Sequence, residues 1–341
     1  MIPSFDEVAS EFRVDSLRQQ LEKIRQEQLR AYRIFAIVLA AGFAILISII
    51  FLYDGNIFED DVWLFLLCAS IAMLFYFYRA KKNLNKGYSK EYKEEMIPLM
   101  LHVMMEAARA ADLASKSTKC TYRAEHGVDR GLLSKTKLFK YMKLDVLEGE
   151  DRISGTISDI GFQYSEIRAE EAYTDNRGVT KTMENFQGFA FLVDFHKNFQ
   201  GTTIIESRGR TIRNYKMKLR KHRDLARMST VSIAFDKFYK VRTDDDTLTR
   251  YLLPINMLEK LLALGKMFPK KKIAISLNDG LFALVIHRMD LFEVRGFRPV
   301  SEKTLRRTYE ELKVIMELVF TLGLNRRIWG PVNLNNLRNA K

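Results

Sequence analysis

The stretch IFAIVLAAGFAILISIIFLY at residues 34–53 decides the organisation of this chain, because none of its residues carries a charge. A second uncharged stretch, VWLFLLCASIAMLFYFY, follows at residues 62–78. An α-helix rises about 1.5 Å per residue, so the two stretches would be roughly 30 and 26 Å long, and both can cross the hydrocarbon core of a bilayer. The sequence therefore predicts a hairpin of two membrane-spanning helices joined by the short loop 54–61.

Two other interpretations of these stretches are weaker. A secretory signal has an apolar segment of about 7–15 residues close to the N-terminus, followed by a cleavage site. Here the first stretch is longer, begins at residue 34 and precedes a second stretch. Helices buried in a soluble core are the other alternative, and the length and composition of both stretches favour the membrane hairpin.

The charges that flank the two stretches predict their orientation, because Lys and Arg resist translocation while short acidic loops cross readily. The loop 54–61 holds four carboxylates and neither Lys nor Arg. Basic residues instead precede the first stretch and follow the second: Arg18, Lys23, Arg25, Arg30 and Arg33, then Arg79, Lys81, Lys82, Lys86 and Lys90. We expect both termini to be cytoplasmic and the loop to be external.

Composition limits the class of protein further. Cys68 and Cys120 are the two cysteines of 341 residues, so they make no disulfide framework, which agrees with a reducing compartment. The net charge of +13 predicts a basic body beside an anionic membrane leaflet. Neither cysteine has metal-ligand neighbours at suitable spacing, and we expect no cofactor.

Residues 1–33 are predicted to form a cytosolic helix that leads into the first span. Ser4 and Glu7 make a capping-box pattern, and no Gly or Pro interrupts the chain from there to Gly42. Apolar residues then follow at coiled-coil spacing, with Gln28 at the remaining position: Val14, Leu17, Leu21, Ile24 and Ala31. This seam could support a homo-oligomer or could dock on the body of the protein.

Residues 79–150 are predicted to form a helix and then a linker with short elements. The helix has an apolar side rich in methionine, which is typical of core packing and would also suit an adaptable partner groove. That side consists of Met96, Leu99, Met100, Val103 and Met104.

Residues 151–341 are predicted to form a cytosolic α+β domain. Apolar residues alternate in four segments, which we expect to form an antiparallel meander with one buried face: 153–158, 162–172, 179–195 and 202–206. The pair Asp279-Gly280 indicates a later hairpin. Helices are expected from Pro254 to Leu264, before Gly265, and from Ser301 to Leu322. About seven strands would also fit a small barrel of the pleckstrin-homology kind.

Several landmarks in this region resemble those of an uncharacterised bacterial family, catalogued as domain of unknown function thirty-one thirty-seven. They are Asp151 with Gly155, Gly161-Phe162, Ser165-Glu166, Phe186 to Phe189, Val193 to Phe195, Phe235 to Phe238, Arg250 to Leu253, and Asp279-Gly280. The resemblance covers roughly Tyr88 to Leu322, and the two-span hairpin is similar to that of many members. It implies a protein of the bacterial cytoplasmic (inner) membrane and brings no activity or site residues with it.

No catalytic signature assembles from the sequence. His222 to Leu225 imitates a kinase catalytic loop, but Ser229 stands where that loop needs Asn, and there is no Gly-rich phosphate loop. The run Asp244 to Asp246 lacks the further oxygen ligands that a cation site needs, and is typical of a helix cap. If the domain is an enzyme of unidentified reaction, the polar groups to consider are Asp194, His196, Glu166 and Asp244.

One basic stretch stands out, because it holds eight cations and no carboxylate. Its members are Arg208, Arg210, Arg213, Lys216, Lys218, Arg220, Lys221 and Arg223. A solvated surface is the simplest interpretation, and contact with anionic lipid is the next, worth about 1 kcal/mol for each cation near the membrane. Nucleic acid is disfavoured, since Tyr215 is the only aromatic residue interleaved for base stacking.

The sequence therefore predicts a two-span membrane protein whose cytosolic domain binds a protein partner as a scaffold, adaptor or sensor. Two alternatives stay open: a module that binds anionic lipid through the basic stretch, and a membrane-associated enzyme.

Overall fold

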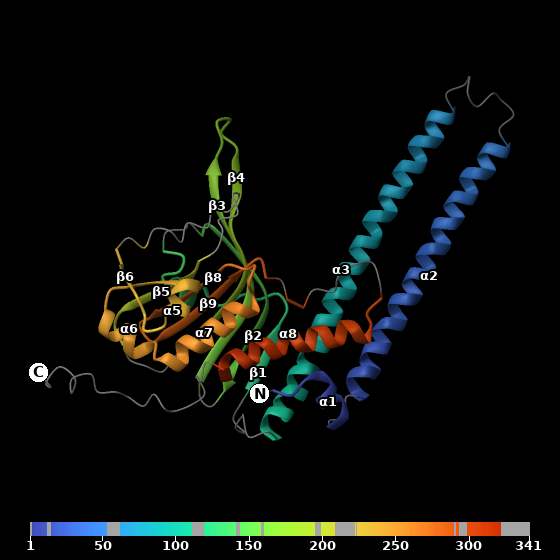
Figure 1. The fold of residues 1–341 in the computed structure, drawn as a ribbon. Helices are drawn as coiled ribbons and strands as arrows, with labels where there is room; N and C mark the ends of the chain where they lie inside the picture. Colours follow the sequence, from blue (N-terminus) through green and yellow to red (C-terminus); the bar gives the residue numbers. More distant parts are fainter. Residues whose placement is uncertain are drawn as a thin grey trace, which may run out of the picture. The chain divides into compact units, whose positions relative to one another are not determined.

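The computed structural model describes residues 2–11, 15–52, 62–110, 119–140, 144–157, 160–194, 199–208, 222, 224–289, 291–292 and 299–321 (Figure 1). The chain divides into two compact units. One unit comprises Met1–Val8, Leu101–Leu291 and Glu310–Lys341 and contains the β-sheet. The other comprises Ala9–Met100 and Phe292–Tyr309 and contains the long apolar helices.

Two helices are long and apolar enough to cross a membrane. They are α2 (Asp15–Leu52) and α3 (Val62–Ala110), and they contain the two predicted spans except for Tyr53, which lies outside the described residues. None of the most apolar window of α2 is buried, and only 6% of that of α3 is. Ile37 is 67% exposed and Phe65 is 70% exposed. Such exposure is costly in water and is expected of helices that face lipid.

The predicted N-terminal helix is described in two parts, α1 (Phe5–Glu11) and the start of α2 at Asp15. Ser4 and Glu7 form the capping box, since the Ser4 amide donates to Glu7 Oε2 at 2.6 Å and the Glu7 amide donates to Ser4 Oγ at 3.4 Å. Residues 12–14 lie outside the described residues, so one continuous helix over residues 1–33 stays a prediction.

The apolar seam at the start of α2 packs inside the helical unit. Leu17, Leu21 and Ile24 are buried, while Val14 lies outside the described residues. Gln28 is also buried, and its Oε1 accepts a hydrogen bond of 2.9 Å from the Val300 amide of the same unit. The seam is thus covered by segments of its own chain.

The described residues of the unit that contains Leu101–Leu291 include an antiparallel sheet of nine strands, and the α+β class is confirmed. Its spatial order is β1-β2-β3-β4-β9-β8-β5-β7-β6, so β1 and β6 are its two edges and the described strands form no closed barrel. The strands are β1 (Lys119–Arg123), β2 (Val146–Ile157), β3 (Ile160–Thr174), β4 (Thr180–Asp194), β5 (Thr202–Ser207), β6 (Ala226–Met228), β7 (Tyr239–Thr243), β8 (Ile273–Asn278) and β9 (Leu281–His287). Strand β1 precedes the expected domain start at Asp151, within the segment that we expected to be linker.

The remaining described helices are α4 (Arg130–Lys135), α5 (Ile233–Phe238), α6 (Asp246–Leu252), α7 (Ile255–Met267) and α8 (Glu302–Thr321). Pro254 precedes α7 as expected, but α7 continues past Gly265. A Cβ at that glycine would lie 2.4 Å from Phe238 Cε1, so Gly265 permits close packing of the helix and does not end it.

Both faces of the central sheet are buried, whereas the alternation along β4 predicted one. Phe189, Phe191 and Val193 form the expected apolar face. Ala190 and Leu192, which point to the other side, are equally buried, because α4 and the chain after it cover them. This second layer includes Leu133, Leu138 and Phe139, and the expectation of a solvated outer face was wrong for this region.

Candidate functional site

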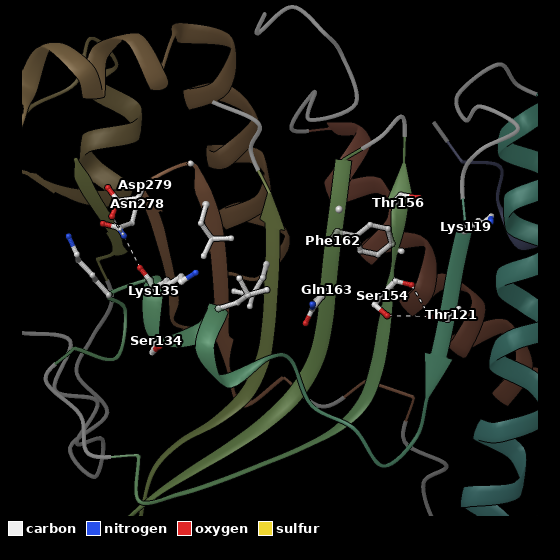
Figure 2. Close-up of a pocket in the computed structure, with 17 residues that line it drawn as sticks. Lys119, Thr121, Ser134, Lys135, Ser154, Thr156, Phe162, Gln163, Asn278 and Asp279 are labelled. Atoms are coloured by element: carbon white, nitrogen blue, oxygen red, sulfur yellow. Dashed lines mark hydrogen bonds between the residues drawn. The ribbon is translucent and has the colours of Figure 1, made fainter. Parts of the chain in front are cut away.

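An open pocket of about 1210 Å³ lies on the sheet face beside α4, and we call it the sheet pocket (Figure 2). Figure 2 shows Ser134 and Lys135 on one side of it and Lys119 and Thr121 on the other. Its polar lining consists of Lys119, Thr121, Ser134, Lys135, Lys137, Ser154, Thr156, Gln163, Asn278 and Asp279. The apolar lining consists of Leu132, Phe162, Leu192 and Leu281.

The strand register explains why this face changes from apolar to polar. Thr121 pairs with Ser154, Ser154 with Gln163, Gln163 with Leu192, and Leu192 with Ala283. These five residues form one row across the sheet. Leu192 and Ala283 are buried beneath α4. Gln163, Ser154 and Thr121 lie towards the β1 edge, and all three line the pocket. The polar end of the row is therefore the pocket floor.

Helix α4 forms the opposite wall and is fixed at both ends. At its start the Asp129 carboxylate accepts a 2.8 Å hydrogen bond from the Leu132 amide, as a helix cap does. At its end the Asn278 side-chain amide donates to the Lys135 carbonyl oxygen at 2.7 Å, and Ser276 Oγ donates to the Thr136 carbonyl oxygen. These bonds explain two polar residues that are buried in the otherwise apolar strand β8.

Glycines determine how the pocket is shaped between β1 and β3. A Cβ at Gly155 would lie 2.0 Å from the Lys119 carbonyl oxygen, so only glycine allows β1 to approach β2 here. A Cβ at Gly161, in contrast, would meet nothing within 4 Å. Gly161 lines the pocket, so this open space belongs to the pocket itself.

The charges in the sheet pocket are unbalanced, with three lysines and one aspartate. Lys137 Nζ donates a 2.7 Å hydrogen bond to the Thr202 hydroxyl, which is neutral. Asp279 has two hydrogen bonds with neutral donors, since its carboxylate accepts from the Gly201 amide before β5 at 3.4 Å and from the Asn278 side chain at 3.1 Å. The pocket thus offers a net positive charge to whatever enters it.

The lining offers hydrogen-bond donors and charge but no assembled acid–base machinery. No His, Cys or Glu is among the described residues that line it. Within the described ranges, no group of three His, Cys, Asp or Glu side chains could hold a metal ion. The described lining therefore presents hydrogen-bond donors and positive charge to a ligand.

A second feature is the hairpin arm, which we define as residues 171–183 (Figure 1). The pairing of β3 with β2 ends at Glu170, and that of β4 with β9 ends at Gly188. In the described part of the chain, the arm's strands therefore pair only with each other. Tyr173 is 46% exposed and Val179 is 52% exposed.

The tip of the hairpin arm is a hydrogen-bonded turn, in which the Gly178 amide donates to the Asp175 carbonyl oxygen at 3.0 Å. Asp175 Oδ1 accepts hydrogen bonds from the amides of Arg177 and Val179, at 2.9 and 3.0 Å. Its other oxygen lies 2.6 Å from Lys181 Nζ. The Lys181 ammonium and these two amides lower the pKa of Asp175 below its ordinary value.

The basic stretch lies almost entirely outside the described residues. Only Arg208 is described, at the end of β5. Its Nε donates to the Tyr239 carbonyl oxygen at 2.9 Å and its amide to the Phe238 carbonyl oxygen at 2.6 Å. Arg208 therefore has a structural contact, and the anionic-surface role of the other seven cations remains a prediction.

The polar groups considered for an enzyme are not brought together among the described residues. Glu166 is buried and accepts a hydrogen bond from the Leu291 amide, while Asp244 accepts one of 2.7 Å from the Thr202 amide. Asp194 pairs through its backbone with Leu281, and His196 lies outside the description. None of the described members of this set lines the sheet pocket.

Two motif-like runs have structural roles instead. In the kinase-like run, His222 is buried, its carbonyl oxygen accepts from Arg242 Nη1 at 3.1 Å, and Asp224 pairs with Lys140 at 2.7 Å. In the acidic run, Asp245 caps α6 by accepting a 2.9 Å hydrogen bond from the Leu248 amide, as predicted.

Some of the family landmarks are explained by folding. Asp151 is buried at a β-bulge with a φ of 57°, and its carboxylate accepts a 2.5 Å hydrogen bond from the Tyr122 hydroxyl. Ser165 Oγ accepts one of 2.9 Å from the Val128 amide. Asp279 and Gly280, with φ of 46° and 80°, form the turn between β8 and β9 that the sequence predicts.

No sequence motif indicates the sheet pocket. Its lysines are Lys119 on β1, Lys135 at the end of α4 and Lys137 just after α4, and no periodicity links them. The only local signal was Asp129, three residues before Leu132, which is a common spacing for a helix cap.

These features define an α+β sheet domain in a chain with two candidate membrane-spanning helices. A family model described as "Protein of unknown function (DUF3137)" matches residues 184–324. This match agrees with the resemblance that the landmarks indicated over residues 184–324, and the part of the resemblance before residue 184 lies outside the matched segment. No curated protein and no solved structure matches the chain.

Proposed function

We propose that this chain is a two-span protein of the bacterial cytoplasmic membrane, with both termini in the cytoplasm. Its sheet domain binds a partner protein at the membrane surface and acts as a scaffold, adaptor or sensor. The bacterial assignment comes from the family resemblance, and the orientation comes from the basic residues that flank the spans.

The exposure of the apolar windows of α2 and α3 is the observation that carries the proposal. A helix of a soluble core would bury such a window, whereas these windows are almost entirely uncovered. Lipid is the environment in which this surface is stable.

The hairpin arm supports a role in binding protein. The arm extends beyond the strands on either side, and its turn is held by the Asp175 carboxylate. Tyr173 before this turn and Val179 after it are exposed. Aromatic side chains on a rigid support are typical contact residues in protein interfaces, because they bury a large area at a small cost in conformational entropy.

The anchoring is tested by fractionation of cells that produce the full chain. We expect the protein to sediment with membranes, to resist extraction by alkaline carbonate and to be released by detergent. Full-length protein in the supernatant after ultracentrifugation without detergent would contradict the proposal.

Partner binding is tested in the same cells by photocrosslinking. A benzoylphenylalanine in place of Tyr173 or Val179 should give a discrete crosslinked product, because both side chains are exposed on the hairpin arm. The matched control is the same group at Tyr251 of α6, which is 37% exposed. Absence of a product from the arm, or the same products from the control, would count against the arm as the contact.

A further inference from the structure

We propose that the sheet pocket binds an organic phosphate, that is, a phosphate ester with an apolar group. This inference goes beyond membrane anchoring and partner binding, since it concerns a small ligand and a different surface. It rests on the charge, the donor chemistry and the size of the pocket.

The charge favours an anion. Lys119 and Lys135 have no ion-pair or hydrogen-bond partner for their ammonium groups among the described residues, and Lys137 is bonded to a neutral hydroxyl. Among the described residues no carboxylate forms an ion pair with these three cations, and the aspartate of the lining, Asp279, accepts hydrogen bonds from Gly201 and Asn278 instead. A concave surface of one sign concentrates ligands of the opposite sign.

The donors favour phosphate over carboxylate. Lysine binds phosphate as a point charge, and a phosphate monoester has up to two negative charges and three acceptor oxygens where a carboxylate has one charge and two oxygens, so it gains more from a lysine-lined pocket. The Thr156 hydroxyl and the side-chain NH2 of Gln163 add donors that a phosphate with several acceptor oxygens can use, whereas the Ser134 hydroxyl already donates to the Gly131 carbonyl oxygen at 2.8 Å.

The size and the apolar lining favour an ester over the free ion. Side chains of Leu132, Leu192 and Leu281 line the pocket between its polar ends, while the Phe162 ring packs against Phe191 on the other face of the sheet. Its volume of about 1210 Å³ exceeds the roughly 300–1,000 Å³ of common small-molecule sites, so inorganic phosphate alone would leave most of it unfilled.

The test uses the full chain in detergent and isothermal titration with phenyl phosphate, with phenol as the neutral control. We expect phenyl phosphate to bind and phenol not to. The double variant Lys119→Gln/Lys135→Gln should weaken binding about tenfold or more, since it removes the cation at either side of the pocket, whichever of the two holds the phosphate. Lys240→Gln/Lys266→Gln changes exposed lysines outside the pocket by the same charge and should leave the Kd unchanged.

A steric variant tests the location independently. Gly161→Trp places a large side chain in the open space of the pocket without a backbone clash at its Cβ, so the protein should keep its thermal midpoint and lose phenyl phosphate binding. Failure of phenyl phosphate to bind the unsubstituted protein would overturn the proposal. The proposal would also be overturned if Lys119→Gln/Lys135→Gln and Gly161→Trp both bound phenyl phosphate with the Kd of the unsubstituted protein.

The source of the phosphate is distinguished by two further ligands. Tighter binding of 1-naphthyl phosphate assigns the pocket to a soluble ester, and tighter binding of dihexanoyl phosphatidic acid assigns it to a lipid headgroup. Neither ligand bears on fractionation or on crosslinking from the hairpin arm, so the pocket proposal and the proposed function can fail separately.

Discussion

Gly188 shows how a single residue can be required by the sheet. Its φ is 150°, and a Cβ there would lie 2.3 Å from the Ile286 carbonyl oxygen of β9. We expect Gly188→Ala to lower the free energy of unfolding by at least about 2 kcal/mol, through backbone strain and this clash. Gly161→Ala is the matched control, because its Cβ meets open space. Scanning calorimetry of the detergent-solubilised chain should separate the two, and equal thermal midpoints would refute the argument.

His287 makes stability depend on pH. Burial, aided by the Arg288 charge, lowers the pKa of His287 from 6.5 to about 3. Below about pH 6.5 the unfolded chain therefore binds a proton that the folded chain does not, and stability is lost as the pH falls towards 3. Allowing for solvent screening, we expect a loss of about 1–2 kcal/mol between pH 7 and pH 5.

The substitution His287→Gln should reduce this loss, as measured by denaturant unfolding at both pH values. Part of the pH dependence should persist in the variant, because burial also lowers the pKa of His222. An identical slope in the variant and the unsubstituted protein would show that His287 is not responsible.

At the scale of elements, α4 depends on partners far away in the chain. It has only six residues, too few for a stable isolated helix, and its last carbonyl groups are bonded by Asn278 and Ser276 of β8. We expect Asn278→Ala to cost about 1–3 kcal/mol, because it removes the partner of the Lys135 carbonyl and of the Thr202 hydroxyl.

Hydrogen exchange read by mass spectrometry can locate this effect. The amides of α4 should exchange faster in Asn278→Ala, while those of α6 should not. Asp245→Ala removes the cap of α6 and should give the reverse pattern, with a cost of about 1 kcal/mol. If both variants accelerate both helices alike, the bond from β8 does not specifically hold α4.

At the scale of the whole molecule, the proposed topology can be read from cysteine accessibility. A cysteine at Asn56 in the loop should react with an impermeant maleimide in intact cells, and one at Arg250 on α6 only after permeabilisation. The native thiols should interfere little: Cys68 lies in the apolar stretch, and burial raises the pKa of Cys120 to about 12, which keeps it protonated. Labelling of Arg250→Cys in intact cells would reverse the orientation.

Features that depend only on neighbouring residues could be predicted without the structure. Two uncharged stretches specify two apolar helices, Ser4 with Glu7 and Asp245 specify helix caps, and Asp279-Gly280 specifies a turn. Each of these depends on local composition or on backbone preferences, which are present before the chain folds.

Tertiary structure alone decided that both sheet faces are buried and that the sheet pocket exists. Leu192 is covered because α4 packs over it, and α4 is held by a bond between Ser276 and Thr136, which are 140 residues apart. The lysines of the pocket likewise come from segments that meet only when β1 pairs with β2 and α4 docks on the sheet. Contacts between such distant residues leave no periodic pattern in the sequence, so only the folded chain brings them together.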